Sequence, residues 1–262
     1  MKFKFDYPKR IICLTEETTE ILYALGAGDK VVGVSAYTKR PIEARKKPSV
    51  SAFIQANYDK ILSLKPDLVL AFSDLQADIS KDLVKLGVPV FTFNQRSVEE
   101  ILSSILVIGG IIGREKKAQE LAEKTALNLE LIKLESSKLK RKPKVYFEEW
   151  DEPIISGIRW VSELIEIAGG IDIFAELRKG QSAKERFVTA EQVIERNPEI
   201  IFSCWCGKKY DETIPNRKNW QKISAVKNNK IFEVDPILML QPGLASLTDG
   251  VKVLAKIIRE NC

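Results

Sequence analysis

The chain has 262 residues, of which 45% are hydrophobic and 29% charged, a composition typical of a folded globular protein with one large domain or two smaller ones. The 41 lysines and arginines barely exceed the 36 acids, so composition gives no support for nucleic-acid binding. The sequence contains no histidine, which excludes histidine-ligated zinc or haem and the serine–histidine and cysteine–histidine catalytic pairs.

The amino terminus, MKFKFDYPKR, lacks an apolar run of the length found in signal peptides. The longest apolar stretch, residues 101–113, is too short to span a bilayer. From the chain as it stands we therefore expect a cytoplasmic protein, and a monomer. The alternative is a periplasmic or cell-surface protein whose leader has been trimmed away.

The first part of the chain alternates short apolar runs with helical patterns. The expected strands are 11–14, 31–34, 68–72 and 90–93, and the expected helices are 17–25, 59–64 and 79–86. A polar loop is expected over 37–57. This rhythm of strand and helix predicts a parallel sheet with helices on both faces.

The rhythm stops at a long charged segment and then resumes. Residues 114–140 contain no glycine or proline and place apolar residues at three- and four-residue steps, which predicts one long helix that Pro143 ends. Beyond it the expected strands are 145–147, 200–204 and 231–234, and the expected helices are 161–168, 191–196 and 245–259. The prediction is an N-terminal α/β lobe over 1–113, a linking helix over 114–142 and a C-terminal α/β lobe over 143–262.

The two lobes contain similar segments. DKILSLKPDLVLAF at 59–72 and EQVIERNPEIIFSC at 191–204 align over fourteen positions without a gap. Each has an acid, an amphipathic turn, a proline, a second acid and a buried strand. The similarity indicates an internal repeat, although a proline and an acid before a strand are also common in α/β proteins. The repeat places Asp59 and Glu191 at equivalent positions.

Aromatic residues gather in the segments that follow the expected strands. Ligands of open parallel sheets bind at the carboxyl ends of the strands, and these segments contain Tyr37, Trp150 and Trp205, with Phe53 and Phe72 nearby. We expect an aromatic collar facing a cleft between the lobes, which favours a broad, partly apolar ligand. The alternative is that these rings cover the core, and for Trp160, which opens a helical pattern, a core position is expected.

Three other features of the sequence have more than one interpretation. Cys204-Trp205-Cys206 is weak as a zinc or iron–sulfur motif; a thiolate bound to cobalt is conceivable, and the alternative is a buried Cys204 beside a half-exposed Cys206. The acids of 148–152 form either a carboxylate site or, as we expect, a hydrated loop before Pro153. The turn at 240–243, LQPG, allows a close approach of the backbone to a ligand. No metal site is expected.

The stretches RIICLTEETTEILYALGAGDKVVGVSAYTKRPIEA (10–44) and NYDKILSLKPDLVLAF (57–72) carry a resemblance to a known family. They resemble the helical-backbone class, class III, of solute-binding proteins of ABC importers, and within it the cobalamin (vitamin B12) binders. The resemblance implies two Rossmann-like α/β lobes with parallel sheets joined by one long backbone helix. It also implies a corrinoid ligand, no catalytic activity and no intrinsic cofactor.

Carried over by position, the resemblance assigns ligand contacts to Tyr37, Phe53, Phe72 and Asp235. At 184–187, where the cobalamin binders have Trp-Pro, this chain has Lys-Glu-Arg-Phe, which allows a related corrinoid such as cobinamide. The expected ligand-binding residues are Tyr37, Phe53, Phe72, Trp150, Arg186, Trp205, Cys206, Asp235 and Gln241.

The resemblance further implies that each lobe docks on arginines of an ABC permease through one surface carboxylate, here Asp59 and Glu191. The alternative for each is an acid favoured by the helix dipole. Three functional alternatives stay open at this point. They are a cytoplasmic corrinoid carrier or sensor, a binder of a siderophore or haem-like chelate, and an enzyme using Cys206 or the acids of 148–151.

Overall fold

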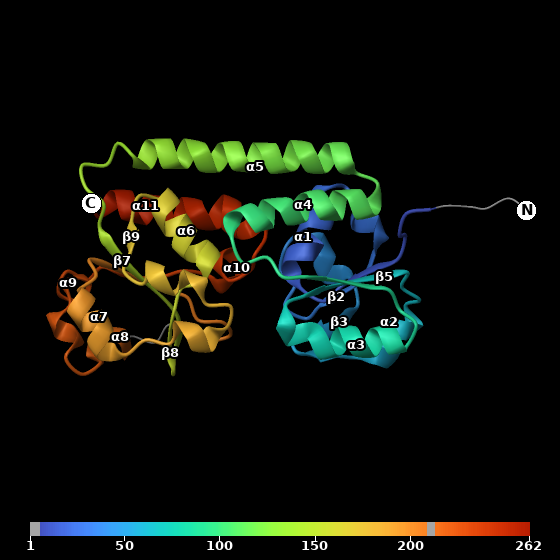
Figure 1. Ribbon diagram of the computed structural model, residues 1–262, viewed down its shortest axis with the longest axis horizontal. Coiled ribbons are helices and arrows are strands. Elements are labelled where there is room, and N and C mark those ends of the chain that lie inside the picture. The colour runs from blue at the N-terminus through green and yellow to red at the C-terminus, as the bar shows by residue number, and fades with distance from the viewer. Residues whose placement is uncertain (1–5, 209–212) are drawn as a thin grey trace, which may run out of the picture. The chain divides into compact units, whose positions relative to one another are not determined.

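The structure is a computed structural model that describes residues 6–208 and 213–262. The chain divides into two compact units (Figure 1). The N-terminal unit comprises the chain up to Gln95 together with Glu99–Lys124, and the C-terminal unit comprises Arg96–Val98 together with Thr125–Cys262. Each unit is an α/β layer structure, which confirms the predicted fold class.

The N-terminal unit is built on a sheet of order β4-β3-β2-β1-β5-β6. Every neighbouring pair is parallel except β3 and β4, which form an antiparallel hairpin. In Figure 1, α1 and α4 lie on one side of this sheet and α2 and α3 on the other. The strands are β1 (Ile11–Cys13), β2 (Val31–Ser35), β3 (Ser49–Ala52), β4 (Gln55–Ala56), β5 (Leu68–Phe72) and β6 (Val90–Phe93). The helices are α1 (Glu16–Ala24), α2 (Tyr58–Ser63), α3 (Ala77–Lys85), α4 (Val98–Ile112) and the 3₁₀ turns η1 (Gly28–Lys30), η2 (Ile42–Lys46) and η3 (Asp74–Gln76).

The C-terminal unit repeats this plan around a sheet of order β11-β10-β7-β8, with β9 parallel to β7. The first strand, β7, pairs in parallel with β10, as β1 pairs with β5 in the other unit. The strands are β7 (Lys144–Asp151), β8 (Ile154–Ser156), β9 (Ile171–Asp172), β10 (Ile200–Ser203) and β11 (Ile231–Glu233). The helices are α6 (Arg159–Ile167), α7 (Ala190–Arg196), α8 (Thr213–Asn216), α9 (Ser224–Lys227), α10 (Pro236–Met239), α11 (Val251–Glu260), the 3₁₀ turns η4 (Ala175–Lys179), η5 (Ala183–Arg186) and η6 (Trp220–Lys222), and the π-helical η7 (Ser246–Gly250).

Helix α5 (Glu115–Ser136) runs from the N-terminal unit into the C-terminal unit, as the long charged segment predicts. It ends at Ser136 and not at the expected residue 142. The amides of Lys138 and Leu139 bond to carbonyls three residues back, which tightens the chain into turns. Pro143 also disfavours helical geometry in the residue before it. The basic run after Ser136 is therefore a turn that leads into β7.

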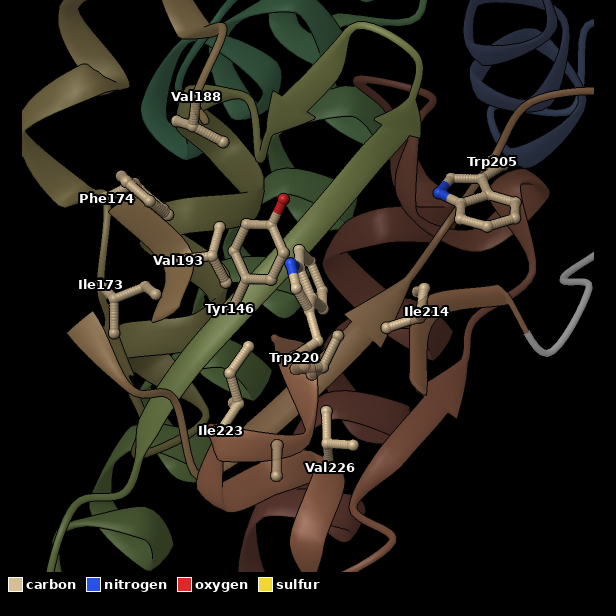
Figure 2. Close-up of a cluster of buried hydrophobic side chains, with 12 residues drawn as sticks. Tyr146, Ile173, Phe174, Val188, Val193, Trp205, Ile214, Trp220, Ile223 and Val226 are labelled. Carbon is tan, nitrogen blue, oxygen red and sulfur yellow. The ribbon is translucent and has the colours of Figure 1, made fainter. Parts of the chain in front are cut away.

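Aromatic and branched side chains fill the core on one face of the C-terminal sheet (Figure 2). Tyr146 on β7 meets Phe174 and Trp220 edge to face, with ring centroids 5.7 and 6.3 Å apart. All four tryptophans of the chain, at positions 150, 160, 205 and 220, belong to this unit. The core of the N-terminal unit is aliphatic by comparison, built from residues such as Ile12, Ile61 and Val69.

The repeated segments occupy equivalent places in the two units. Lys65 and Asn197, which align in the repeat, both have φ of 47°. The second acid of each segment binds the start of the neighbouring first strand: Asp67 accepts the amides of Lys9 and Arg10 at 2.7 and 2.8 Å, and Glu199 accepts the amide of Lys144 at 2.9 Å. The proline–acid motif therefore fastens the first strand of each sheet.

Two expectations for single elements differ from the structure, and one stretch had no predicted element. The predicted loop 37–57 contains the β3–β4 hairpin, and the predicted helix 245–259 begins with a π-helical turn. The apolar stretch 101–113, for which the sequence predicted no element, forms α4. The apolar composition of α4 has a simple cause, because a helix that packs on a sheet and on a second helix needs little polar surface. Gly109 on α4 lets Ala118 on α5 approach so closely that an added Cβ would lie 2.2 Å from the Cβ of Ala118.

Candidate ligand-binding site

The carboxyl edge of the N-terminal sheet carries a group of exposed apolar side chains. Tyr37 follows β2, Phe53 and Ile54 form the β3–β4 turn, and Leu75 follows β5. All four are exposed, and the loops at this edge of a parallel sheet are where ligands bind. The sequence-based prediction contains Tyr37 and Phe53 but missed Ile54 and Leu75, because an aliphatic residue in a loop carries no distinctive signal.

Phe72 ends β5 at the same edge, but its ring is only 6% exposed. Its amide donates to the side-chain oxygen of Gln76, 2.9 Å away. Phe72 therefore belongs to the core beneath the exposed group, and contact of its ring with a ligand stays a prediction.

In the C-terminal unit, the predicted aromatic residues differ in accessibility. Trp150 lies near the end of β7 and is half-buried, and its Nε1–H donates to the Glu152 carbonyl at 2.9 Å. Trp205 is buried in the core cluster, where the Lys208 ammonium lies 5.0 Å from its ring centroid. Trp160 is also buried and donates to the Met239 carbonyl at 2.8 Å, which confirms its expected core position.

The acids that follow in the sequence are part of the structure of β7. Glu148 is fully buried and accepts two hydrogen bonds from Arg217, at 2.7 and 2.8 Å. Glu149, on the opposite side of the strand, accepts two from Arg186, at 2.6 and 3.1 Å. The hydrated loop predicted for 148–152 is therefore wrong, because bidentate guanidinium partners compensate the burial of these carboxylates.

Arg186, a predicted ligand contact, is only 2% exposed. Its guanidinium also donates to the Ser156 carbonyl, and the Ser156 hydroxyl donates to the Arg186 carbonyl at 3.1 Å. The side chain thus holds η5 against β8. Direct contact of Arg186 with a ligand stays a prediction.

The two cysteines of the Cys-Trp-Cys segment differ, as the alternative for this motif proposed. Cys204 is buried and Cys206 is exposed. Burial raises the pKa of the Cys204 thiol well above its usual value, and the charges of Glu149 and Asp235 act in the same direction. Such a thiol is a poor nucleophile and a poor metal ligand. Within 6–208 and 213–262, no group of three or more cysteines and acids could hold a metal ion.

Two further predicted contacts flank the short helix α10, which follows β11. Asp235 is exposed, and its carboxylate caps α10 by accepting the Ile237 amide at 2.9 Å. Gln241 is half-buried in a turn that its carbonyl closes with the Gly243 amide at 2.8 Å. Both side chains are at least partly exposed, and their contact with a ligand stays a prediction.

The two predicted docking carboxylates are exposed at equivalent positions. Asp59 lies in the first turn of α2 and Glu191 in the first turn of α7. The helix caps are made by Asn57 and Thr189. The side chains of Asp59 and Glu191 make no hydrogen bond or ion pair with any other residue that the structure describes, so both carboxylates are available to a partner.

Another acid near the N-terminal carboxyl edge has a strongly altered pKa. Glu17 on α1 is 1% exposed, and burial raises the pKa of its carboxyl to about 8. Thr15 donates to Oε1, while Oε2 lies buried with no hydrogen-bond partner among the described residues. Glu17 is therefore largely protonated at neutral pH, and no sequence pattern distinguished it.

A groove of about 350 Å³ lies between α5 and α11 in the C-terminal unit. Its lining includes Ile132, Lys252, Lys256 and Arg259, and none of the predicted ligand-binding residues. Among the helices that the structure describes, none combines the length and hydropathy needed to cross a lipid bilayer.

Taken together, two α/β units with parallel sheets, a long helix that runs from one into the other and an exposed apolar group at a carboxyl edge define a binding protein. The sequence of residues 11–238 matches the family described as periplasmic binding protein. The chain belongs to this family. Its class is the substrate-binding component of ABC importers, and its homologues are transport proteins and not enzymes.

Curated relatives cover nearly the whole chain. An uncharacterized ABC transporter substrate-binding lipoprotein, YvrC of Bacillus subtilis, is 33% identical over 260 residues, which are 96% of this chain and 80% of YvrC. A vitamin B12-binding protein of Vibrio parahaemolyticus is 29% identical over 94% of this chain and 88% of its own.

Solved structures agree with the fold. A possible iron-binding periplasmic solute-binding protein of Staphylococcus epidermidis has a TM-score of 0.82 and 29% identity over 97% of this chain and 99% of its own. The periplasmic vitamin B12-binding protein BtuF of Vibrio cholerae has a TM-score of 0.77 and 26% identity over 98% and 99%. These matches confirm the predicted class of solute-binding protein, while its ligand is a separate question.

Proposed function

We propose that this protein binds a corrinoid, cobalamin or cobinamide, and delivers it to an ABC importer. The observation that carries the proposal is the exposed apolar group at the N-terminal carboxyl edge, Tyr37, Phe53, Ile54 and Leu75. Such a surface suits the broad, partly apolar face of a corrin ring. The names of the vitamin B12-binding relatives support the same ligand class.

The C-terminal unit would contribute polar contacts. Asp235 follows β11, Gln241 follows α10, and Trp150 adds a half-buried indole. A corrin ring carries amide side chains, which both a carboxylate and a carboxamide can bind. The corrinoid is cargo in this proposal, and no resident cofactor is needed.

The proposed place of action is outside the cytoplasmic membrane. The family is periplasmic by description, and YvrC is named a lipoprotein. This favours the alternative location over the cytoplasmic one expected from the amino-terminal sequence. A cytoplasmic carrier or sensor would not meet the outer face of an importer. Cell fractionation of the native host distinguishes the two locations. Recovery of the protein only in the cytosolic fraction would contradict a role in import.

The test is a titration of the purified protein with cyanocobalamin, dicyanocobinamide, haemin and a ferric hydroxamate, followed by calorimetry and by visible absorbance. We expect micromolar or tighter binding of at least one corrinoid. Binding of haemin or the hydroxamate alone would replace the corrinoid with another chelate, which the name of the possible iron-binding relative also suggests. Failure of both corrinoids at micromolar concentration ends the proposal.

Two tyrosines of the N-terminal unit provide a matched pair of variants. Tyr37 and Tyr7 are both 52% exposed, but only Tyr37 lies at the carboxyl edge. We expect Tyr37→Ala to weaken corrinoid binding about tenfold through the loss of ring contact. Tyr7→Ala should leave the dissociation constant unchanged. Equal affinities of the two variants would remove Tyr37 from the site.

A further inference from the structure

The tip of the β3–β4 hairpin combines an exposed aromatic side chain with an unfavourable backbone. Ala52 pairs with Gln55, so the loop between them contains only Phe53 and Ile54. Two-residue hairpin loops require positive φ and normally use glycine, asparagine or aspartate there. Phe53 has φ of 53°, in the left-handed region that a bulky residue rarely adopts. An aromatic residue is therefore held at a place where glycine would fold more easily.

A second strained residue lies close by in the fold. Ser73, directly after β5, has φ of 61°. Its amide donates to the Phe93 carbonyl at 2.7 Å, and its hydroxyl accepts the Leu75 amide at 3.3 Å. Strained residues persist only where surrounding contacts determine the conformation, and such residues cluster at ligand-binding places.

One side chain connects both strained turns. Gln76 ends η3 and is fully buried. Its Oε1 accepts the Phe72 amide at 2.9 Å, and its Nε2 donates to the Phe53 carbonyl at 2.6 Å and to the Leu14 carbonyl at 3.4 Å. Both ends of the carboxamide are used, so the side chain joins the ends of β1 and β5 to the hairpin tip.

These bonds fix the backbone from which the exposed apolar group projects. The Phe53 carbonyl accepts the hydrogen bond from Gln76, and Ile54 is the next residue in the chain. Leu75 is the neighbour of Gln76 in η3. A carboxamide is the only neutral side-chain group that both donates twice and accepts. A methionine would fill the same length without these bonds, and a glutamate would lack the two donors.

We propose that Gln76 is the positioning residue of the ligand-binding edge, and that it acts mainly by holding Phe53 in its left-handed conformation against the ligand. The part of this inference that concerns a ligand rests on the proposed function. The bracing of the hairpin tip does not, because it is a property of the ligand-free N-terminal unit.

The bracing is tested by hydrogen–deuterium exchange of the whole, ligand-free protein. In Gln76→Met we expect amides of 51–57 and the amide of Phe72 to exchange about tenfold faster than in the wild type. The control is Ile61→Val, which removes a methyl group from the core of the same unit. It should lower stability without a selective effect on 51–57. Unchanged exchange in Gln76→Met overturns the bracing, whether or not any corrinoid binds.

The action through Phe53 is tested by a double-mutant cycle in corrinoid affinity. We expect Gln76→Met and Phe53→Gly each to weaken binding about tenfold, and the double variant to bind no more weakly than Phe53→Gly alone. Phe53→Gly should also be more stable than the wild type, because glycine relieves the positive φ. Independent effects that multiply to about a hundredfold would overturn the positioning role. If wild-type protein binds neither cyanocobalamin nor dicyanocobinamide, the proposed function fails, and the exchange experiment alone decides the bracing.

Discussion

At the scale of single residues, both units contain buried polar side chains that differ in how their burial is compensated. Glu148 and Glu149 are compensated by paired guanidinium groups, and Gln76 uses every hydrogen-bonding group of its carboxamide. Glu17 differs from these, since one of its oxygens is buried without a partner among the described residues. Its burial therefore costs less in the protonated than in the ionised form.

This difference gives the stability a pH dependence. The folded chain holds the Glu17 proton up to a pKa of about 8, whereas the ordinary value is 4.5. Between these values the folded state binds a proton that the unfolded state has lost, so the contribution of Glu17 to stability falls as pH rises through this window. We expect Glu17→Gln to remove this pH dependence, so that its stability relative to the wild type rises by about 3–4 kcal/mol between pH 5 and pH 8.

The measurement is urea unfolding at about pH 5, 6.5 and 8, which span the range between the ordinary and the raised pKa of Glu17. Glu120→Gln, an exposed position on α5, is the control and should follow the wild type. A wild-type stability that does not fall relative to Glu17→Gln between pH 5 and 8 would show that the Glu17 carboxyl titrates normally.

At the scale of elements, the contact of α4 with α5 depends on the absence of one side chain. Gly109 and Gly110 are adjacent on α4, but only Gly109 faces Ala118. An added methyl group at Gly109 would overlap the Cβ of Ala118, while at Gly110 it would meet nothing within 4 Å. A larger residue is therefore tolerated at Gly110 but not at Gly109.

We expect Gly109→Ala to destabilise the protein by about 1–3 kcal/mol through overpacking. Gly110→Ala should be neutral or stabilising by up to about 1 kcal/mol, because alanine favours helix more than glycine does. Thermal and urea unfolding of the two variants provide the measurement. Equal losses of stability would mean that helix geometry and not the α4–α5 contact dominates.

The sequence predicted the bounds of an element well where its apolar periodicity agrees with the residues that begin or end helices and strands. The strands β5 and β10 and the helix α7 lie within a residue or two of their predicted bounds, since proline, acid and apolar run all favour the same boundaries. It predicted no element for α4, whose apolar surface matches neither a surface helix nor a membrane span. It also failed for β3 and β4, because a hairpin tip of Phe53 and Ile54 lacks the usual turn residues.

For the site, the sequence predicted residues with an exposed aromatic or charged group better than residues with a buried role. Tyr37, Phe53, Asp59 and Glu191 are accessible as expected. Phe72, Arg186 and Trp205 proved buried, because strand position alone does not tell which face of a loop is covered. Gln76 could not be found at all, since its three partners are distant in sequence and only folding brings them together.

At the scale of the whole molecule, the internal repeat places two equivalent carboxylates where a partner protein could bind them. Asp59 and Glu191 are exposed at the same place in the two units, and their side chains bond to no other described residue. Two such carboxylates can each accept a bidentate arginine, which fixes orientation more than affinity. The acids one step along the repeat, Asp67 and Glu199, are instead used within their own unit.

We expect Asp59→Lys and Glu191→Lys, singly and together, to leave corrinoid affinity unchanged and to reduce stimulation of the importer ATPase. The double variant should lose about tenfold or more in apparent affinity for the permease, since each charge reversal replaces an attraction with a repulsion. The measurement uses the importer of the native host in proteoliposomes. Glu195→Lys, an exposed acid one turn further along α7, is the control. Full stimulation by the double variant would exclude these acids as the docking points.

The confinement of every indole to the C-terminal unit divides the molecule optically. Indole emission reports on the surroundings of residues 150, 160, 205 and 220, while the N-terminal unit contains tyrosines such as Tyr7, Tyr23, Tyr37 and Tyr58 as its absorbing rings. Indole emission therefore follows the unfolding of the C-terminal unit alone in the unmodified protein. A Tyr58→Trp variant would add one indole to the N-terminal unit. A ligand that changes the emission of this added indole would do so by altering the surroundings of residue 58.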